Sequence, residues 1–252
     1  MRKSLAINVA ANTNIPGVRG PIYPDGSFVY LPIPEREPTA VPVPTYGELL
    51  DELPALPINM PTDSIDRPVH LDPEFADYPF CERHTYGDEH AVKAGPIAEL
   101  DAGDWLLFYA TLTSHEPPTG QPIGDPVDWV APKWGGYLIG AFGVDRVYTG
   151  SEYAALSAAD RAPFSNNAHV KRDPVDAEVL VLGDERSRLF DRAFPLSDPE
   201  SGSTANRIVT ELSNDSGKGP WWRRRLWFDP DATATLEEIM TGRRPIDSVL
   251  RH

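Results

Sequence analysis

The sequence predicts an α+β fold, built on a curled and mostly antiparallel sheet with a few short helices. Apolar and aromatic runs of strand length outnumber helical segments, and turn-forming residues separate them. Of the 27 prolines, 13 fall between Pro16 and Pro73. Proline fixes φ and lacks a backbone donor, so this stretch predicts extended chain. We expect a single domain, residues 1–252, with a proline-rich segment (1–75) packed on a core (76–252).

The expected strands follow apolar alternation or short apolar runs. Leu5, Ile7 and Val9 alternate with smaller or polar residues, which predicts a first strand. A turn at 24–26 precedes the apolar residues 28–31, which would anchor the extended segment. Further strands are expected at residues 105–112, 137–148, 178–182, 188–195 and 222–228. The Pro/Gly-rich loop 116–132 is long enough to be functional.

Helices are expected where capping residues precede an apolar pattern. Thr45 and Glu48 have capping-box spacing and predict a helix to about Leu53. A second capping-box match joins Thr235 and Glu238, with Gly242 as the expected stop. Two more short helices are expected at residues 88–93 and, capped by Ser151, at residues 151–156.

The charge balance is strongly acidic and poor in lysine. Asp and Glu number 38 against 23 Lys and Arg, a net charge of −15, and only 5 of the 23 are lysines. Such a surface is typical of proteins that stay soluble near molar salt, so we expect a halophilic source. Phosphate contacts need Lys and Arg, so nucleic-acid binding would require a local basic face.

The cellular compartment is predicted from the absence of membrane-span, signal-peptide and disulfide patterns in the sequence. It has no run of about eighteen apolar residues, which argues against a membrane span. Met1 to Ala11 is too short and mixed for the apolar part of a signal peptide. The single cysteine, Cys81, cannot form an internal disulfide, which fits a reducing compartment. We therefore expect a cytoplasmic protein.

A first group of polar residues offers acid–base chemistry. The candidates are His70, Asp72, Asp88 and His90, although acidic residues also favour the first turn of a helix. Cys81, His84 and His90 have a spacing that a metal might use, but zinc sites normally show two tight ligand pairs. We therefore expect no metal. The sequence has no phosphate-binding glycine loop or dinucleotide motif, so no cofactor is expected.

A second group lies in residues 164–172 and suits nucleic-acid recognition. It holds two amides, an imidazole and two cations: Asn166, Asn167, His169, Lys171 and Arg172. Amides read base edges and cations hold phosphate, so this loop is a candidate binding segment. The alternative is a polar loop whose side chains cap its own backbone.

Tryptophans and arginines form a third group. Arg223, Arg224 and Arg225, flanked by tryptophans, make up the basic run in residues 221–227. Aromatic rings beside arginine are typical of surfaces that bind single strands or extruded bases. In a strand, alternate side chains would instead face the core or form internal ion pairs. Trp129 and Trp134 could wall a pocket or close the core.

Three motifs together resemble a known family. They are Pro21–Gly26 leading to Leu31–Pro34, then His70-Leu71-Asp72-Pro73, then Gly103–Tyr109 followed by Gly136–Phe142. Over residues 5 to 195 the chain resembles the third class of nucleotide-modification-associated domains. The third motif is also similar to PUA-like barrels of the EVE, ASCH and YTH kind. The long proline-rich front departs from those barrels.

The resemblance implies a function in making or recognising hypermodified bases, on a curled sheet or PUA-like barrel. The leading hypothesis is a protein that binds an extruded base in nucleic acid, DNA more than RNA. Asn167 and His169 would then contact the base edge, Trp129 or Trp134 would stack on it, and the cations would hold phosphate. One alternative is an enzyme acting on a nucleotide or modified base; another is a non-catalytic interaction module. An enzyme requires titratable groups that converge in a pocket, whereas a reader requires stacking aromatics there.

Overall fold

The computed structural model describes residues 1–12 and 17–250. Pro16, the first proline of the expected extended segment, lies outside this range. Within the described part of the chain, no helix has the length and apolar character needed to cross a membrane.

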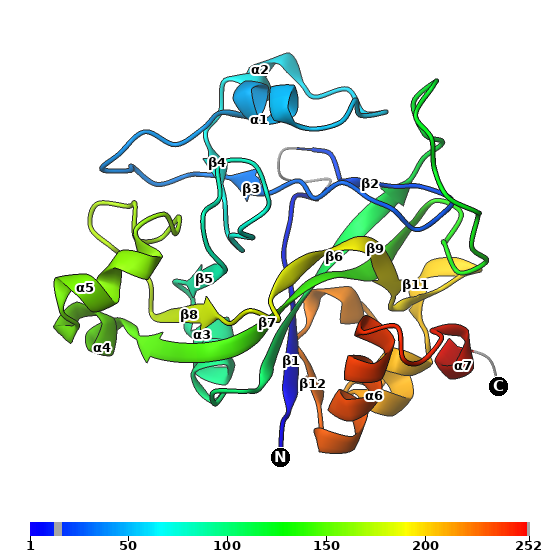
Figure 1. Ribbon diagram of the computed structural model, residues 1–252. Coiled ribbons are helices and arrows are strands. Elements are labelled where there is room, and N and C mark those ends of the chain that lie inside the picture. Colours follow the sequence, from blue (N-terminus) through cyan, green and yellow to red (C-terminus); the bar gives the residue numbers. More distant parts are fainter. Residues whose placement is uncertain (13–16, 251–252) are drawn as a thin grey trace.

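One eight-stranded sheet forms the centre of the molecule (Figure 1). Its strands are β1 (Ser4–Asn8), β2 (Pro21–Ile22), β5 (Thr85–Asp88), β6 (Trp105–Ser114), β7 (Trp134–Thr149), β8 (Val179–Gly183), β9 (Arg188–Pro195) and β12 (Leu226–Phe228). The order along the sheet is β12-β1-β6-β7-β8-β5, with β2 paired to β6 and β9 paired to β7. All these pairings are antiparallel except those of β6 with β1 and β2. The predicted α+β fold with a curled, mostly antiparallel sheet is confirmed; the sheet does not close into a barrel.

Strand β7 is long enough to pair with strands in both halves of the sheet. Its first part, up to Gly143, pairs with β6 and β9, and its last part, from Val144, pairs with β8. The register shifts between Val144 and Arg146, where the strand passes from one set of partners to the other. Gly140, in the first part, leaves room for the Phe75 ring, since a Cβ there would lie 2.6 Å from that ring. The edge β8–β5 is thereby carried away from the β1–β6 centre.

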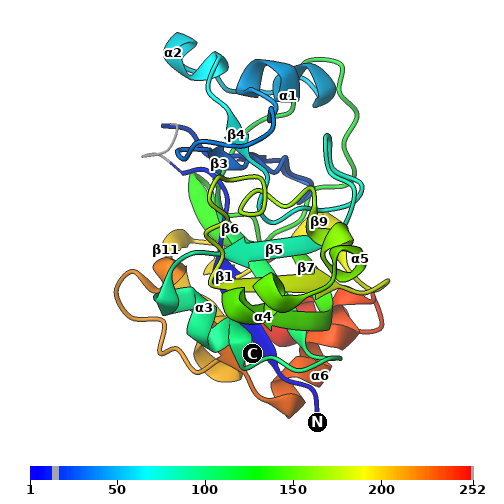
Figure 2. The ribbon, with the colours of Figure 1, turned by 90° about the vertical axis from the view of Figure 1, so that its left-hand side faces the viewer.

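In the described chain, the proline-rich segment lies over this sheet and is largely extended, apart from two short helices. Tyr30 and Leu31 are buried, and β3 (Ile33–Pro34) pairs with β4 (Val69–His70). Helices α1 (Tyr46–Glu52) and α2 (Thr62–Ile65) lie at the outer end of this layer (Figure 2). Backbone hydrogen bonds join residues 38–40 to Lys171 and Asp173 of the distant polar loop. Whether the chain folds as one domain stays a prediction.

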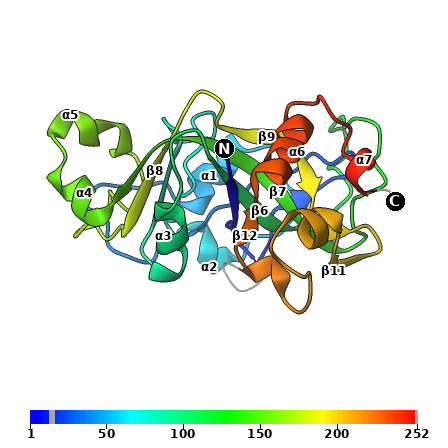
Figure 3. The same ribbon diagram turned by 90° about the horizontal axis from the view of Figure 1, so that it is seen from below.

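Two apolar clusters fill the two faces of the sheet. Along β6, Leu106 and Phe108 point to one cluster, and Leu107 and Tyr109 point to the other, as the two-residue period of a strand requires. Helix α3 (Ala91–Ala98) packs on the first face and α6 (Pro230–Met240) on the second, so they lie on either side of β1 in Figure 3. Because both faces are covered, β6 is apolar from Trp105 to Ala110.

The remaining elements are short. They are α4 (Gly150–Ala155), α5 (Ala158–Arg161), α7 (Asp247–Leu250), 3-10 turns at Ala162–Phe164 and Trp221–Arg223, a π-helical turn at Ile208–Leu212, and the hairpin β10 (Ser197–Asp198) with β11 (Ser201–Ala205). Residues 116–132 hold no helix or strand, as expected of a long loop.

Several capping predictions can be checked against the helices. The Thr45–Glu48 capping box is present, and so the start of α1 is confirmed. The Thr235–Glu238 match was wrong, because α6 already begins at Pro230 with Asp229 as its cap, although Gly242 (φ +70°) does follow its end. Helix α4 is capped by Thr149 rather than Ser151.

Two local predictions gave the wrong type of structure. Residues 85–88 form strand β5, and helix α3 starts only at Ala91, so the expected helix at 88–93 begins too early. The expected strand 222–228 is a 3-10 turn followed by the short strand β12. In both places two residues outside helix and strand separate the two elements, and the apolar pattern alone does not reveal them.

Candidate functional site

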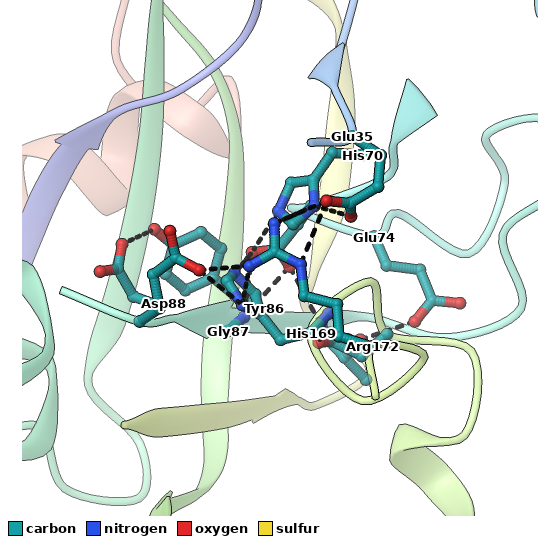
Figure 4. A network of polar contacts seen from close by, with 12 residues as sticks. Glu35, His70, Glu74, Tyr86, Gly87, Asp88, His169 and Arg172 are labelled. Atoms are coloured by element: carbon teal, nitrogen blue, oxygen red, sulfur yellow. Dashed lines mark hydrogen bonds and ion pairs between the residues drawn. The ribbon is translucent and has the colours of Figure 1, made fainter. Parts of the chain in front are cut away.

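A polar cavity of about 230 Å³ lies where the extended N-terminal layer meets the β5 edge of the sheet. Its walls come from β1 and the residues after it, β4, β5, the start of α3 and the loop 165–176. All four acid–base candidates, His70, Asp72, Asp88 and His90, line it. His169 and Arg172, from the candidate binding loop, line it as well. The structure thus brings two sequence-predicted groups together in one cavity (Figure 4).

At its base, two imidazoles and one carboxylate face one another. His70 Nε2 lies 4.0 Å from Asp72 Oδ2, and His169 Nε2 lies 3.7 Å from the same oxygen. The two rings meet edge to face with centroids 4.8 Å apart. All three side chains are at most 5% exposed. Three potential electron-pair donors therefore converge on one buried point.

Carboxylates on the outer side of each imidazole fix its orientation. His70 Nδ1 is 2.7 Å from Glu35 Oε2, and His169 Nδ1 is 2.8 Å from Asp176 Oδ1. Burial raises the pKa of Glu35, but hydrogen bonds from His70 and Arg172 lower it more, to about 2. The Arg172 guanidinium also lies 3.4 Å from His70 Nδ1 and 3.3 Å from His169 Nδ1, but the carboxylates are closer. An ionised carboxylate only accepts, so we assign the proton to Nδ1 of each ring, and in a neutral ring Nε2 presents its lone pair to Asp72.

Asp72 is held in place by two donors. The backbone N–H of Gly87 contacts both carboxylate oxygens at 3.1 Å, and the Asn167 amide donates to Oδ1 at 3.0 Å. Burial raises the pKa of Asp72 well above its ordinary value, more than these donors lower it. Burial also lowers the pKa of His169. A Cβ on Gly87 would lie 2.8 Å from His169 Cδ2, so this glycine allows the ring to approach.

Arg172 ties the acidic groups of the site together. Its guanidinium bonds Glu35 at 2.8 Å and Asp176 at 2.6 Å, and it also pairs with Glu89. The side chain is 7% exposed. Burial lowers the pKa of Arg172, but hydrogen bonds to Glu35 and Asp176 raise it above its ordinary value. Arg172 is therefore an internal counter-charge that holds both imidazole-orienting carboxylates, and not a free phosphate ligand.

The rim of the cavity carries further polar groups. Asp88 accepts from the Tyr86 hydroxyl at 2.7 Å and lies 3.5 Å from the Lys93 ammonium. The His90 ring is 72% exposed and lies 3.3 Å from Glu89. Among the described lining residues other than histidine, Tyr86 is the one aromatic. The rim thus offers charge and hydrogen bonds and little stacking surface.

The amides of the candidate loop serve the protein itself. Both amide hydrogens of Asn167 are used, on Asp72 and on the Thr85 hydroxyl, and its oxygen accepts from the His169 N–H. Asn166 bonds Glu74 at 2.6 Å and accepts from Lys171. Neither asparagine nor Lys171 lines the cavity. The expected base-edge contact of Asn167 is therefore replaced by a role in positioning Asp72 and His169.

The two expected stacking tryptophans lie elsewhere. Trp129 is 6% exposed and lines a separate cavity with Asn206 and Arg207. Trp134 contacts the Trp222 ring and carries the Arg19 guanidinium over its face. Neither ring lines the polar cavity, so in this structure they cannot stack on a base held there.

The arginine run forms a groove directly beside the site. Arg223, Arg224 and Arg225 line a cavity of about 440 Å³ that shares Asn8 and Lys93 with the polar cavity. All three arginines are exposed. Arg224 pairs with Asp215 at 2.9 Å and Arg225 bonds the Val92 carbonyl. We call the surface formed by these arginines and Lys93 the basic groove.

The spacing that suggested a metal does not form a cluster. In the described chain, the groups of histidine, cysteine and acidic side chains close enough to hold an ion leave out Cys81, His84 and His90. Two such groups exist: His70 with Asp72 and His169, and Glu89 with His169 and Asp176. Their members are separated by up to about one hundred residues, so local spacing could not reveal them.

Sequence reasoning missed several residues of the site. Glu35, Asp176 and Tyr86 received no role, although each bonds a residue that was singled out. The one usable signal was Asp176, four residues after Arg172, a spacing that allows an ion pair. Glu35 joins the site only because β3 pairs with β4.

The buried polar cluster beside the basic groove makes this cavity the candidate functional site of an α+β protein. The chain matches the family model described as nucleotide modification associated domain 3 over residues 3–239, and it belongs to that family. The resemblance is thus confirmed, and the description of the family associates it with nucleotide modification. No curated protein and no solved structure matches the chain.

Proposed function

We propose that this protein is an enzyme that acts on a nucleotide or modified base bound in the polar cavity. The observation that carries the proposal is the convergence of His70, Asp72 and His169 from two distant chain segments at one buried point. Such a buried, partner-oriented cluster is costly to assemble and is typical of catalytic sites.

The make-up of the walls favours an enzyme over a reader of extruded bases. A protein that recognises an extruded base needs aromatic side chains, because stacking on them offsets the free energy of unstacking the base. The cavity instead gathers titratable side chains from β4, β5 and the loop 165–176, while Trp129 and Trp134 lie elsewhere. A volume of about 230 Å³ is below the ~300–1,000 Å³ of drug-sized sites, which suits one base or a small nucleotide fragment.

The basic groove supports a phosphate-bearing substrate. It adjoins the cavity through Asn8 and Lys93, so a base in the cavity would leave its phosphates near Arg223 and Arg225. This local basic face meets the requirement that an acidic chain must satisfy to hold nucleic acid. Arg224, paired with Asp215, contributes less free charge.

The test is conversion of defined substrates. The protein is incubated with oligonucleotides and nucleotides carrying plain, hydroxymethylated or glycosylated pyrimidines, with divalent ions supplied, and nucleosides are analysed by mass spectrometry. We expect a mass change in one modified base, and a loss of at least about 100-fold in rate for His169→Gln. His115→Gln, which removes an imidazole outside the cavity, is the matched control and should keep the rate. Tight binding of modified bases without conversion would instead support the hypothesis that the protein recognises modified bases without acting on them.

The groove is tested separately. Arg223→Gln with Arg225→Gln should weaken binding on all sequences alike and flatten the dependence of affinity on salt, as loss of phosphate contacts does. Arg243→Gln, an arginine of the distant α6–α7 connection, is the control. If the double variant binds with unchanged affinity, the basic groove does not bind phosphate.

A further inference from the structure

The inner atoms of the His70–Asp72–His169 cluster are arranged as a set of ligands. Nε2 of each ring and Oδ2 of Asp72 are 3.7 and 4.0 Å apart, and all three lie within 4.8 Å of one another. Bonds of about 2.0–2.1 Å in tetrahedral geometry place ligand atoms about 3.3 Å apart. An ion would therefore draw the three groups together by modest side-chain movements.

The outer atoms have the pattern that orients metal ligands. A ligating histidine almost always donates its second ring N–H to a carboxylate or carbonyl, which fixes the tautomer and raises basicity. His70 donates to Glu35 at 2.7 Å and His169 donates to Asp176 at 2.8 Å. Asp72 is bonded by the Gly87 N–H, which contacts both carboxylate oxygens, and by Asn167, which donates to Oδ1. All three inner groups thus have orienting partners, which a chance cluster would not require.

The charge of the surroundings also favours a cation. Among the described residues that line the cavity or bond its histidines, the acidic ones are Glu35, Asp72, Asp88, Glu89 and Asp176, and the permanently basic ones are Lys93 and Arg172. With Asp72 ionised, as a metal ligand would be, these groups leave three surplus negative charges in and around a buried site. A bound divalent ion is often the largest local charge and would offset most of this surplus.

We propose that His70, Asp72 and His169 bind one divalent first-row transition-metal ion, of the Zn²⁺ or Fe²⁺ class. Two imidazole nitrogens and one carboxylate oxygen suit these ions better than Mg²⁺ or Ca²⁺, which take oxygen ligands. Three protein ligands leave at least one position for water or substrate, the arrangement of catalytic rather than structural sites. All three residues line the cavity, so that position faces the bound molecule.

The second group, Glu89 with His169 and Asp176, is the weaker choice. Arg172 already pairs with both of its carboxylates. A cation there would have to displace the guanidinium or lie against it. The guanidinium contacts no oxygen of Asp72 within ion-pair distance in the described chain, so the first group is free of that competition.

The inference deepens the proposed function, since the ion would lie where the nucleotide or base is acted on. Binding of the ion itself is measurable without any nucleotide. Wild-type protein, stripped with a chelator and returned to metal-free buffer, is titrated with Zn²⁺ and with Co²⁺ by calorimetry. We expect one ion per chain. In the Co²⁺ form, proton NMR should show two strongly shifted exchangeable imidazole N–H signals, one from each Nδ1–H.

Variants then assign the ligands. Asp72→Asn and His169→Gln should each weaken binding at least about 100-fold, and Glu35→Gln about 10–100-fold through loss of the orienting carboxylate. His115→Gln should bind like the wild type. Circular dichroism and thermal melts verify that each variant folds, and the stoichiometry and NMR signals of the wild type test the proposal even where a variant does not.

The outcomes separate the two proposals. No binding of either ion to the wild type at micromolar concentrations overturns the metal site, as does binding that Asp72→Asn leaves unchanged. Full conversion of substrate by chelator-stripped protein overturns the catalytic position assigned to the ion while sustaining the enzyme. An ion bound by the three residues, with no substrate converted or bound, sustains the metal site and overturns the proposed function.

Discussion

Arg172 gives the sharpest test of how the site is held together. Its guanidinium, 7% exposed, is shared by Glu35, Glu89 and Asp176, of which Glu35 is 3% exposed. Arg172→Met keeps an unbranched apolar stem and removes the charge, so the carboxylates lose their common partner. Removing one member of a buried charge network costs about 3–5 kcal/mol. For a chain of this size, 1 kcal/mol shifts the melting temperature by about 2–4 °C, which predicts a fall of about 6–20 °C.

The assay is thermal and denaturant unfolding of the variant beside a matched control. Arg207→Met removes an arginine from the exposed pair with Glu211 and should leave the melting temperature almost unchanged. Adding Glu35→Gln to Arg172→Met should restore part of the loss, because it removes one unpaired charge while the amide oxygen still accepts from His70. Equal melting temperatures for Arg172→Met and Arg207→Met, or no recovery in the double variant, would refute this account.

Three further predictions concern other parts of the molecule. Burial raises the pKa of Asp25, but hydrogen bonds from Ser27 and Gly124 lower it more, so its contribution to stability is complete above its unfolded pKa and is lost as pH falls through the folded value. Asp25→Asn should therefore reduce stability at pH 7 and have little effect near pH 2, as measured by urea unfolding. Burial, with the nearby Glu74 charge, raises the pKa of Cys81 to about 12, so native protein at pH 8 should react with a thiol reagent far more slowly than unfolded protein. The −15 net charge predicts a melting temperature that rises between ~0.1 M and ~2 M KCl through screening; a flat or falling value would contradict it.

Much of the architecture was accessible from the sequence because it depends on neighbours along the chain. The alternation in β1, the apolar runs of β6 and β7 and the capping box at Thr45 report local geometry, and each element formed where expected. The family was recognised from short motifs that are contiguous in the chain. Errors arose where two elements abut, as between β5 and α3, since a change of direction leaves little trace in apolar periodicity.

The sequence by itself determined which residues were chemically notable, including His70, Asp72, His169 and the arginine run. The tertiary structure alone decided which of them meet. His70 and His169 are far apart in the chain and touch because the extended N-terminal layer lies against the loop 165–176. The same packing turned Asn167 and Arg172 inward, to bond Asp72 and Glu35, rather than outward toward a ligand. Which side chains meet across a separation of about one hundred residues depends on how the sheet edge packs against the extended N-terminal layer. The spacing of residues along a single sequence does not contain that information.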